Sequence, residues 1–538
     1  MSHAVETFFP AWNHRLATRR NDRPNRPLSP SILNMNTEIE LCLCVLPKQQ
    51  GALIKQISVL FPAASRPEEQ ELYGIYYDTP ALDLARHRMG LRLRKQDGYW
   101  VQAVKLGRPG EGALHTRLEF EHATKNQALE LHRISHPSTR DFLTSPKIAP
   151  LLQPVFATRI LRTLWQIPYK KDGLVELALD IGVVECQGNS LVVSEIECEL
   201  KSGPIEAVFA VAQTLAEHFA LFPQLRSKAE RGYRLFTRTA ATPEEARIPE
   251  LHASMSPWRA RQTVMLECLR HLEYNLMEIG HGDDVEFVHQ ARVAIRRMRS
   301  ADRTFSRLPT DAHWGRIMKD LQALGRMLGQ IRDCDVLLHD SLTVAKQSFP
   351  SEKRAWSVIR SRLLSRRGQY IKAFCTELAS PHIGLMLLHT LQKLHQQQPP
   401  SGQGTDDALL SFAGRALDRH AKAIRKLVCD WKNLNETQRH TLRKQIKKMR
   451  YAVEFFSSLY NANKVGKFLA SQQLMQKTLG ILNDATVTRL ILQDMATELP
   501  QVAFACGMAT GWHACARQQN LEKADQALKD MKQAKPFW

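Results

Sequence analysis

The pattern of hydrophobic residues changes near residue 240, and this change constrains the fold more than any other feature of the chain. From residue 38 to about 201, apolar and polar residues alternate in short runs such as LRLRK (91–95) and TRLEFEH (116–122). Alternation of this kind, punctuated by Gly- and Pro-rich stretches, predicts antiparallel strands. After a linker at residues 239–257, long helical patterns with few breakers continue to the end of the chain.

The change divides the 538 residues into an α+β chain of two parts. We predict a strand-rich domain at residues 36–238, the linker, and an all-helical domain at residues 258–538. Residues 1–35 are rich in Arg and Pro and lack the apolar stretch of a signal peptide. We expect them to be a disordered extension or a mis-annotated one, with translation starting at Met35.

Charge separates the two halves as well. The whole chain carries a formal charge of +20. Residues 1–250 contain 31 Lys and Arg against 28 Asp and Glu, a net of +3, whereas residues 251–538 contain the other 43 and 26, a net of +17. A strongly basic helical half predicts a polyanionic partner for that half.

Other features exclude several classes of protein. No apolar run approaches 18 residues, so we expect no membrane-spanning helix and no membrane partner. The ten cysteines include no CxxC pair and no Cys/His spacing of the zinc type. The simplest interpretation is a reduced protein of the cytoplasm.

The helical half repeats itself. HQARVAIRRMR begins at His289 and HTLRKQIKKMR begins at His440, an offset of 151 residues. The same offset relates Leu328 to Leu479 and Gly329 to Gly480. We therefore predict a pseudo-symmetric helical bundle made of two units, roughly residues 258–395 and 408–538.

The repeated motif places basic residues on one face of a helix. At about 100° per residue, His289, Arg292, Arg296 and Arg299 fall within about 80° of one another, and Arg297 widens this stripe on the other side. Ile295 and Met298 lie roughly opposite, where we expect the helix to face the core. Neighbouring like charges repel, so two such stripes indicate a bound anion. The candidate residues are His289, Arg292, Arg296, Arg297, Arg299, His440, Arg443, Lys447, Lys448 and Arg450.

A basic helix face exposed to solvent is the alternative interpretation of these stripes. Nucleic acid is disfavoured as a specific partner, because the sequence shows no helix-turn-helix and few aromatic residues among the Arg and Lys. A flexible phosphate chain in a groove between the two units fits better. The motif H-x-x-R-x-x-x-R-R-x-R, followed by L-G-x-x-R-D-x-D-V, resembles the CHAD domain, and this resemblance implies a helical bundle that binds inorganic polyphosphate.

In the strand-rich half, charged residues share one face of each predicted strand. Glu38 shares a face with Glu40, Arg92 shares one with Arg94, and Arg117 shares one with Glu119 and Glu121, while apolar residues lie on the opposite faces. Two architectures remain open: a sheet with its charged face in water, or a closed barrel with a charged lumen. In a barrel, carboxylates would hold hard divalent cations, and Arg and Lys would hold phosphate oxygens.

An ordered series of motifs resembles the CYTH domain, the fold of the triphosphate tunnel metalloenzymes. The series is Glu38-x-Glu40, YYDTP (76–80), LRLR (91–94), Lys105, ALHTRLEFE (113–121), ELALD (176–180), EIECELKSG (195–203) and SKAERGY (227–233). The resemblance implies an antiparallel tunnel of eight strands with flanking helices. It also implies that the tunnel binds triphosphate together with Mg²⁺ or Mn²⁺.

The resemblance implies three sets of tunnel residues. The metal ligands would be Glu38, Glu40, Glu197 and Glu199. The phosphate contacts would be Arg92, Arg94, Lys105, Arg117, Lys228 and Arg231. Glu176 and Asp180 match acidic positions that would serve catalysis.

A CYTH domain followed by a CHAD domain is similar to bacterial inorganic triphosphatases. We therefore expect a metal-dependent enzyme that hydrolyses inorganic triphosphate, binds polyphosphate and resides on polyphosphate granules of the cytoplasm. Two alternatives remain open. One is a non-catalytic polyphosphate-binding protein, and the other is a hydrolase or cyclase of an organic triphosphate such as ATP or thiamine triphosphate.

Cys42 departs from the family pattern E-x-E-x-K, in which a lysine contacts phosphate. A neutral thiol cannot replace an ammonium group, and one lost charge-assisted contact weakens phosphate binding by about 1.5–3 kcal/mol. We therefore expect weakened activity. Cys42 and Cys44 as ligands of a soft metal form a weaker alternative, because neither Cys nor His residues complete the site.

Overall fold

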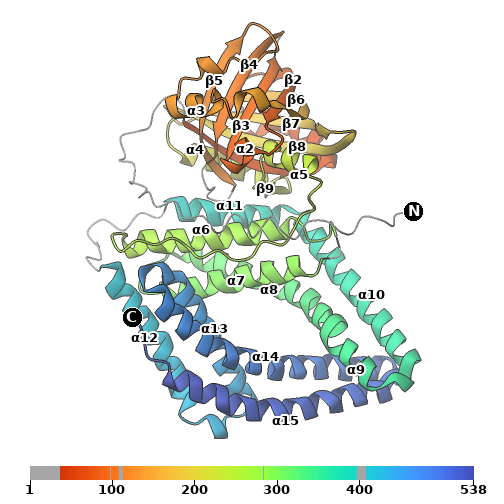
Figure 1. Ribbon diagram of the computed structural model, residues 1–538. Coiled ribbons are helices and arrows are strands. Elements are labelled where there is room, and N and C mark those ends of the chain that lie inside the picture. Colours follow the sequence, from red (N-terminus) through yellow and green to blue (C-terminus); the bar gives the residue numbers. More distant parts are fainter. Residues whose placement is uncertain (1–36, 97, 108–112, 283, 397–407) are drawn as a thin grey trace. The chain divides into compact units, whose positions relative to one another are not determined.

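The computed structural model describes residues 37–96, 98–107, 113–282, 284–396 and 408–538 (Figure 1). The expectations for residues 1–35 lie outside the described residues. Residues 38–538 form one compact unit. Within it, strands dominate up to Pro223 and helices dominate from Pro257 onward.

Eight strands close into the predicted antiparallel barrel. They are β1 (Thr37–Val45), β2 (Glu68–Asp78), β3 (Met89–Gln96), β4 (Tyr99–Leu106), β5 (Leu114–Thr124), β6 (Gln153–Tyr169), β7 (Gly173–Cys186) and β8 (Asn189–Ser202). The sheet order is β5-β4-β3-β2-β6-β7-β8-β1-β9, and an additional pairing of β5 with β1 closes the ring. The short β9 (Leu221–Pro223) extends the sheet beside β1. Of the two architectures left open by the sequence, the closed barrel is therefore confirmed and the open sheet is not.

The hydrophobic core of this half lies outside the barrel. On β3, Leu91 and Leu93 are fully buried, and Leu91 packs with Leu143 of α3 (Pro137–Leu143). On β7, Leu177 is fully buried and belongs to the same cluster as Phe209 of α4 (Glu206–Ala216). Because strand side chains alternate, burying the apolar face under helices turns the charged face inward.

A glycine permits the close approach of two long barrel strands. Gly182 of β7 lies opposite Ile160 of β6. A Cβ atom at residue 182 would lie only 1.9 Å from the carbonyl oxygen of Arg159, a backbone atom that cannot swing away. Glycine at this position therefore lets β6 and β7 curve together around the lumen.

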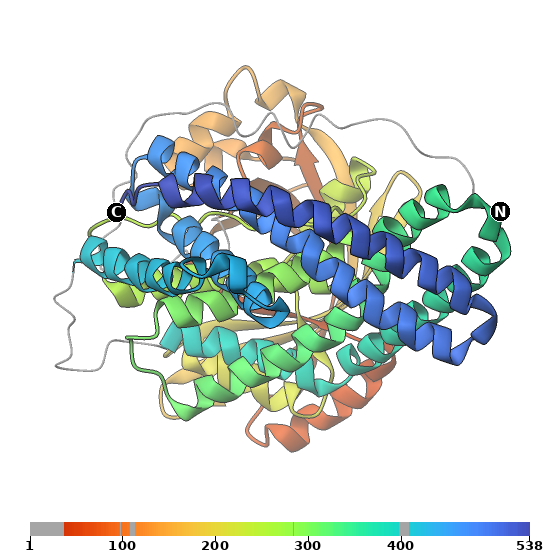
Figure 2. The same ribbon diagram turned by 90° about the horizontal axis from the view of Figure 1, so that it is seen from below.

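The helices of the other half are α6 (Pro257–Leu276), α7 (Glu286–Thr304), α8 (Ala312–Val336), α9 (Leu342–Ser348), α10 (Lys353–Leu378), α11 (Pro381–Gln396), α12 (Leu409–Val428), α13 (Glu436–Phe456), α14 (Ala462–Glu498) and α15 (Ala503–Gln533). Adding 151 to the bounds of α7 gives 437 and 455, which lie inside α13. The same shift takes α6 onto α12 to within one residue at both ends, and it takes the first residues of α8 and α10 to within one residue of the starts of α14 and α15. Figure 2 shows the long helices α14 and α15 lying side by side.

The apolar faces of the repeated helices form the core of the helical half. Ile295 and Met298 of α7 are buried, as the helical periodicity predicts. Their counterparts Ile446 and Met449 of α13 are buried in the same cluster. Among the residues that the structure describes, none of the helices combines the length and the hydropathy needed to cross a bilayer. All ten cysteines are free thiols.

We expect Gly182→Ala to lower the free energy of unfolding by about 2 kcal/mol or more, because the added methyl group forces β6 and β7 apart. Gly90→Ala on β3 is the matched control, since its Cβ would meet no heavy atom within 4 Å. Denaturant unfolding followed by tryptophan fluorescence measures both variants. Equal loss of stability in the two would contradict the close approach of the strands.

Candidate active site in the tunnel

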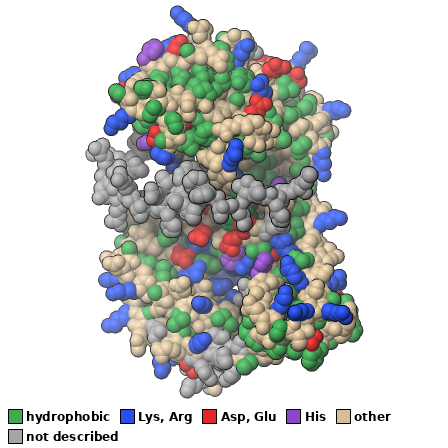
Figure 3. Space-filling view, turned by 45° about the vertical axis from the view of Figure 1, so that its right-hand side comes forward, with side chains coloured by type: hydrophobic (Ala, Val, Ile, Leu, Met, Phe, Trp, Pro, Cys, Tyr) green, Lys and Arg blue, Asp and Glu red, His purple; other side chains and the backbone are tan. Residues whose placement is uncertain are grey.

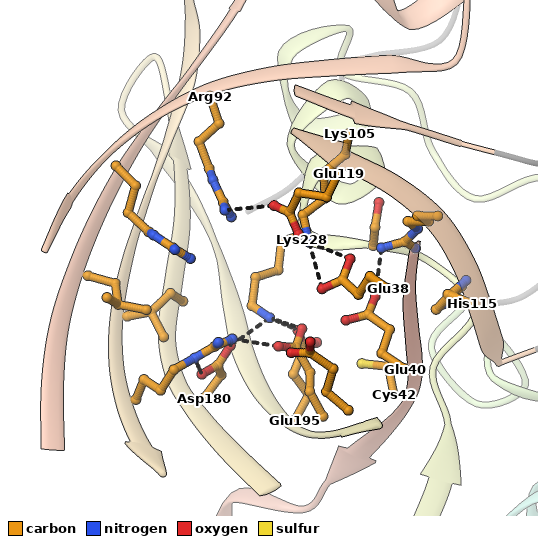
Figure 4. Close-up of a pocket in the computed structure, with 18 of the residues that line it drawn as sticks. Glu38, Glu40, Cys42, Arg92, Lys105, His115, Glu119, Asp180, Glu195 and Lys228 are labelled. Carbon is orange, nitrogen blue, oxygen red and sulfur yellow. Dashed lines mark hydrogen bonds and ion pairs between the residues drawn. The ribbon is translucent and has the colours of Figure 1, made fainter. Parts of the chain in front are cut away.

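Charged side chains from both halves of the barrel wall line a cavity of about 230 Å³ (Figure 4). The predicted tunnel residues that line it are Glu38, Glu40, Arg92, Arg94, Lys105, Arg117, Glu176, Asp180, Glu197, Glu199 and Lys228. Arg231 does not line the cavity, but it forms an ion pair with Glu195, which does. The structure therefore brings the predicted tunnel residues together.

The lumen also holds His115 and several charged residues outside the predicted set: Glu119, Glu121, Arg162, Glu195 and Lys201. The alternation of charged and apolar residues in the sequence already places the carboxylates and Lys201 on the charged faces of their strands. Arg162 was missed because β6 carries both Arg159 and Arg162, and the alternation alone does not say which of the two faces inward. His115 gives no comparable signal in the sequence.

The first group of charges lies between β1, β4 and β5. The Lys105 Nζ atom lies 2.8 Å from a Glu38 carboxylate oxygen and 3.0 Å from one of Glu119. Arg117 Nη1 lies 2.7 Å from Glu40 Oε1. The pairing of β5 with β1 brings these residues together, so the contact that closes the barrel also builds this part of the site.

Two arginines stand side by side on β3. Arg92 and Arg94 both lie near Glu121, at 3.4 and 3.5 Å. Arg92, together with burial, lowers the pKa of Arg94 to about 10. Arg92 also lies 3.6 Å from Glu119, which pairs with Lys105 as well, so the two guanidinium groups lie beside two carboxylates. Guanidinium groups in such ion pairs are suited to bind phosphate oxygens in place of the carboxylates.

The second group of charges centres on Lys228, which enters the barrel from outside the sheet. Its Nζ atom lies 2.7 Å from both Asp180 and Glu197 and forms an ion pair with Glu195 as well. Arg162 pairs with Asp180 at 2.6 Å and also with Glu197. Although burial raises the pKa of Glu197, Lys228 and Arg162 hold it well below its usual value.

The placement of Lys228 depends on α5 (Lys228–Phe236). Ser227 caps this helix by accepting a hydrogen bond from the Glu230 backbone amide, and the Glu230 side chain bonds back to the Ser227 amide. A Cβ at Gly232 would lie 2.2 Å from the ring of Phe156 on β6. Glycine thus lets α5 lie directly against the barrel wall, with Lys228 and Arg231 directed at the carboxylates of β8.

Crowded carboxylates in the lumen are the residues that could hold a divalent cation. Burial, followed by the negative charges of Glu197 and Glu38, raises the pKa of Glu40 to about 7. Glu199 lies opposite Glu40 in the pairing of β1 with β8, and burial raises its pKa too. Carboxylate oxygens that repel one another in this way form a donor set suited to Mg²⁺ or Mn²⁺.

The two predicted catalytic carboxylates have different surroundings. Glu176 accepts a hydrogen bond from Gln166 at 2.7 Å and lies 3.1 Å from the Lys201 Nζ atom. Asp180 is fully buried between Arg162 and Lys228, which hold its pKa below the usual value in spite of burial. Asp180 therefore anchors two cations, whereas Glu176 lies at a more solvent-accessible part of the wall.

The two thiols of β1 have separate environments. Cys42 lines the cavity, and its sulfur and the carboxylate oxygens of Glu195 and Glu197 lie within 4.8 Å of one another. Lys228 already pairs with both of these carboxylates, so its ammonium group takes the position that a metal ion bound by Cys42 and these carboxylates would need. Cys44 instead accepts a hydrogen bond from Gln224 Nε2 at 3.0 Å.

A second cluster of charges lies in the helical half, where basic residues of the two copies meet. We call it the basic cluster; it contains His289, Arg292, Arg296 and Arg299 of α7, Arg332 of α8, and Lys447 and Lys448 of α13. Burial, followed by Arg332, Arg296, Lys447 and Arg292, lowers the pKa of His289 to about 4. Arg303, Lys444 and Arg299 likewise contribute to a lowered pKa of Lys448, after burial.

Arg297 is an exception to the predicted stripe. It is 4% exposed, forms an ion pair with Glu454 and lies over the ring of Phe455 at 5.0 Å. Its side chain therefore ties α7 to α13 and does not belong to the basic cluster. Arg450 pairs with the same glutamate at 3.0 Å. Figure 3 shows Lys and Arg side chains gathered over the helical elements.

Two family models match the chain: the CYTH domain over residues 36–233 and the CHAD domain over residues 263–493. The chain is a CYTH domain followed by a CHAD domain. The resemblance inferred from the sequence motifs is thereby confirmed.

A curated relative from Haemophilus influenzae, named inorganic triphosphatase, is 31% identical over 211 residues. The match covers 39% of this CYTH-CHAD chain and 57% of that relative. Among solved structures, the CHAD domain of Ricinus communis is 24% identical with a TM-score of 0.47, covering 55% of this chain and 98% of that one. A putative adenylyl cyclase from Hippeastrum, described as having a dominant triphosphatase activity, is 18% identical with a TM-score of 0.29, covering 38% and 98%. Both TM-scores lie below 0.5, so neither structure adds to the family match.

We expect Cys42→Lys to lower the KM for tripolyphosphate about tenfold, because it adds a cation where Lys228, Arg162 and Arg231 already balance the nearby carboxylates. Cys42→Met is the matched control, since it adds similar length without charge. Steady-state phosphate release with Mg²⁺ measures both. An unchanged KM in the lysine variant would show that Lys228 already supplies the missing charge.

Proposed function

We propose that the tunnel of the CYTH domain hydrolyses inorganic triphosphate with the help of a divalent cation. One observation carries the proposal: a cavity inside a closed barrel, whose wall holds carboxylates and cations in direct contact with each other. The named activity of the Haemophilus influenzae relative supports it at the level of the family.

A triphosphate–metal complex would bind in the lumen by replacing the ion pairs between its cations and carboxylates. Lys105 and Arg117 now pair with Glu38 and Glu40. When phosphate oxygens enter, these cations transfer their hydrogen bonds to the phosphates, and the released carboxylates become available to a cation. Each buried charge keeps a partner of opposite sign throughout, so the exchange avoids the cost of an unpaired buried ion.

Glu38, Glu40 and Glu197 would hold the divalent cation, with Glu199 at the edge of the same set. When bound, such a cation stabilises the negative charge that develops on phosphoryl oxygens. Arg92 and Arg94, which lie on another part of the wall, would hold the phosphate chain from the opposite side. Binding by groups on several strands fixes the chain in line for attack, which is the main protein contribution to phosphoryl transfer.

We assign different catalytic roles to Glu176 and Asp180. Gln166 and Lys201 hold Glu176 in a fixed orientation, and this carboxylate is placed to orient the attacking water. Asp180 is buried and shared by Arg162 and Lys228, so it positions these two cations toward the substrate. A carboxylate engaged by two cations is a weak proton acceptor, and this disfavours Asp180 as the general base.

The lining of the cavity favours an inorganic substrate over a nucleotide. Among the described residues that line it, Leu72 and Ile160 are the large apolar ones, and none is Phe, Tyr or Trp. An adenine or thiazole ring needs an apolar or aromatic wall to stack against. Hydrolysis of an organic triphosphate therefore remains the second candidate, and a non-catalytic tunnel the third.

We expect the protein to release phosphate from tripolyphosphate in a Mg²⁺- or Mn²⁺-dependent way and much faster than from ATP or thiamine triphosphate. Glu38→Gln/Glu40→Gln should lose at least about a hundredfold in kcat/KM, because it removes two of the carboxylate donors. The matched control is Glu68→Gln/Glu69→Gln, which neutralises two exposed carboxylates at the start of β2. A phosphate-release assay that shows no metal-dependent turnover of any of the three substrates would contradict the proposal.

We further propose that the CHAD domain binds polyphosphate at the basic cluster. Cations of both copies contribute to this cluster, and after burial their positive charges depress the pKa of His289. A polyanion relieves this repulsion, so binding is strongest at low ionic strength. Bound polyphosphate would also place the enzyme on polyphosphate granules.

Glycines in the repeat leave space for Arg292 of the basic cluster and for its counterpart Arg443 of α13. A Cβ at Gly329 of α8 would lie 2.5 Å from Arg292 Nη1, and that atom donates a hydrogen bond to the Gly325 carbonyl at 2.9 Å. In the second copy, a Cβ at Gly480 would lie 4.0 Å from Arg443 Nη2. The repeated Gly–Arg contact supports a common role for Arg292 and Arg443, in which each side chain is guided across the neighbouring helix.

We expect a variant with Arg292, Arg296, Arg443 and Lys447 changed to Ala to lose polyphosphate binding at physiological salt by about a hundredfold or more. Changing Lys353, Arg354, Arg360 and Lys372 of α10, all exposed, to Ala removes the same charge elsewhere and serves as the control. Titration with polyphosphate at several salt concentrations measures the affinities. Equal weakening in the two variants would mean that net charge, rather than the basic cluster, governs binding.

A further inference from the structure

A short connecting segment, Leu221–Lys228, links the tunnel charges to the helical half; we call it the strap. It begins with β9, which pairs antiparallel to β1 in the register Cys44 with Phe222 and Leu43 with Pro223. It ends at Lys228, whose ammonium group enters the lumen. Lys228 is thus placed by the strap and α5, unlike the barrel-strand cations, which the sheet itself positions.

Hydrogen bonds fix the middle of the strap to β1. The Gln224 backbone amide donates to the Cys42 carbonyl at 2.8 Å, and the Gln224 side chain donates to the Cys44 sulfur at 3.0 Å. The same side chain accepts a hydrogen bond from the Arg226 backbone amide at 3.2 Å. Gln224 is 6% exposed, so these bonds are shielded from water.

Arg226 carries the strap to the helical half. Its guanidinium group forms an ion pair with Glu278, which follows the end of α6, and lies 4.2 Å above the ring centre of Tyr274. The Arg226 and Glu278 side chains are 15% and 17% exposed. A largely buried ion pair that also stacks on an aromatic ring holds its geometry far more strictly than a surface pair.

The other end of the strap also meets the helical half. A Cβ at Gly384 of α11 would lie 1.7 Å from the carbonyl oxygen of Leu221. The glycine therefore lets α11 pack directly on the backbone of β9. The helical half therefore contacts the strap at Leu221 and at Arg226, and β1 of the tunnel binds Gln224 between them.

We propose that Arg226, through Glu278 and Tyr274 of the helical half, is a positioning residue that sets where Lys228 stands in the tunnel. Only Ser227 separates Arg226 from Lys228, and this serine is the N-cap of α5. A change in the direction of the Arg226 side chain is therefore transmitted to the first turn of α5. The triphosphate site of the CYTH domain is complete only when the CHAD domain holds the strap.

The inference rests on the proposed triphosphatase function, and it concerns binding of the phosphate chain before any chemistry. Lys228 pairs with Asp180, Glu195 and Glu197 in the tunnel. A displaced Lys228 would leave these carboxylates partly uncompensated, and their negative charge would oppose a triphosphate. Loss of the Arg226–Glu278 pair should thus raise KM more than it lowers kcat.

The test compares Glu278→Gln with the wild-type full chain. We expect Glu278→Gln to raise the KM for tripolyphosphate about tenfold while kcat changes less than about twofold. The matched control is Glu498→Gln, which breaks the ion pairs of Glu498 with Arg362 and Arg366 inside the helical half without touching the strap. The control should keep the wild-type KM even if its stability falls.

A variant with the charges of the Arg226–Glu278 pair reversed distinguishes loss of positioning from misfolding. Arg226→Glu alone should raise KM, and Arg226→Glu/Glu278→Arg should recover part of the wild-type KM, because a pair of opposite charges is restored. A wild-type KM in a folded Glu278→Gln variant would overturn the inference, as would equal KM increases in Glu278→Gln and Glu498→Gln.

A measurement without turnover separates this inference from the proposed function. Calorimetric titration with tripolyphosphate without added divalent cation reports binding to the tunnel when wild type and Glu278→Gln both carry the Arg292, Arg296, Arg443 and Lys447 changes to Ala, which remove binding at the basic cluster. If the wild type binds tripolyphosphate but does not hydrolyse it, the proposed function fails, and weaker binding by Glu278→Gln still supports the role of Arg226. Equal binding by the wild type and Glu278→Gln overturns the role of Arg226 and leaves the proposed function standing.

Discussion

The pairing of opposite charges inside the barrel is the constraint on which the rest of this structure depends. A lumen that holds Glu38, Glu40, Glu197 and Asp180 would unfold the barrel if these carboxylates lacked partners, because burying an unpaired charge costs several kcal/mol. Lys105, Arg117, Arg162 and Lys228 supply the partners. The apolar core must then lie outside the barrel, under helices such as α3 and α4.

The same pairing gives the tunnel its capacity for chemistry. Ion pairs in a confined lumen are individually strong, yet in the proposed function each would exchange its partners for a phosphate on one side and a divalent cation on the other. Glu40 shows the balance most clearly, since burial, followed by its neighbours Glu197 and Glu38, raises its pKa to about 7. The paired charges thus keep the barrel folded, and the same carboxylates are the proposed ligands of a cation.

Much of the tunnel was predictable because strand alternation reports directly on which residues share a face. Glu38 with Glu40 and Arg92 with Arg94 line the cavity as the period of two predicts. Closure of the barrel was left open by the sequence, because it depends on the pairing of β1 with β5, strands separated by three others in the chain. Arg162 was missed for a related reason, since alternation along β6 does not identify the inward face.

Prediction from the sequence had different limits in the helical half. Periodicity correctly placed Ile295 and Met298 in the core, but it left Arg297 at the edge of the stripe, where a small rotation decides between solvent and core. The structure turns Arg297 inward to Glu454, a partner on another helix that no local pattern reveals. The strap was likewise invisible, because Arg226 and Glu278 are separated by 52 residues and belong to different sequence patterns.

The two regions that we propose to bind phosphates differ in one physical respect that would account for different roles. In the tunnel, cations alternate with carboxylates, so the site can take up a divalent cation together with the phosphates and stabilise charge developing in a reaction. In the basic cluster, the groups that shift the pKa of His289 are all cations. Such a cluster attracts a polyanion but offers few oxygen donors for a metal, so it is suited to holding a phosphate chain rather than cleaving it.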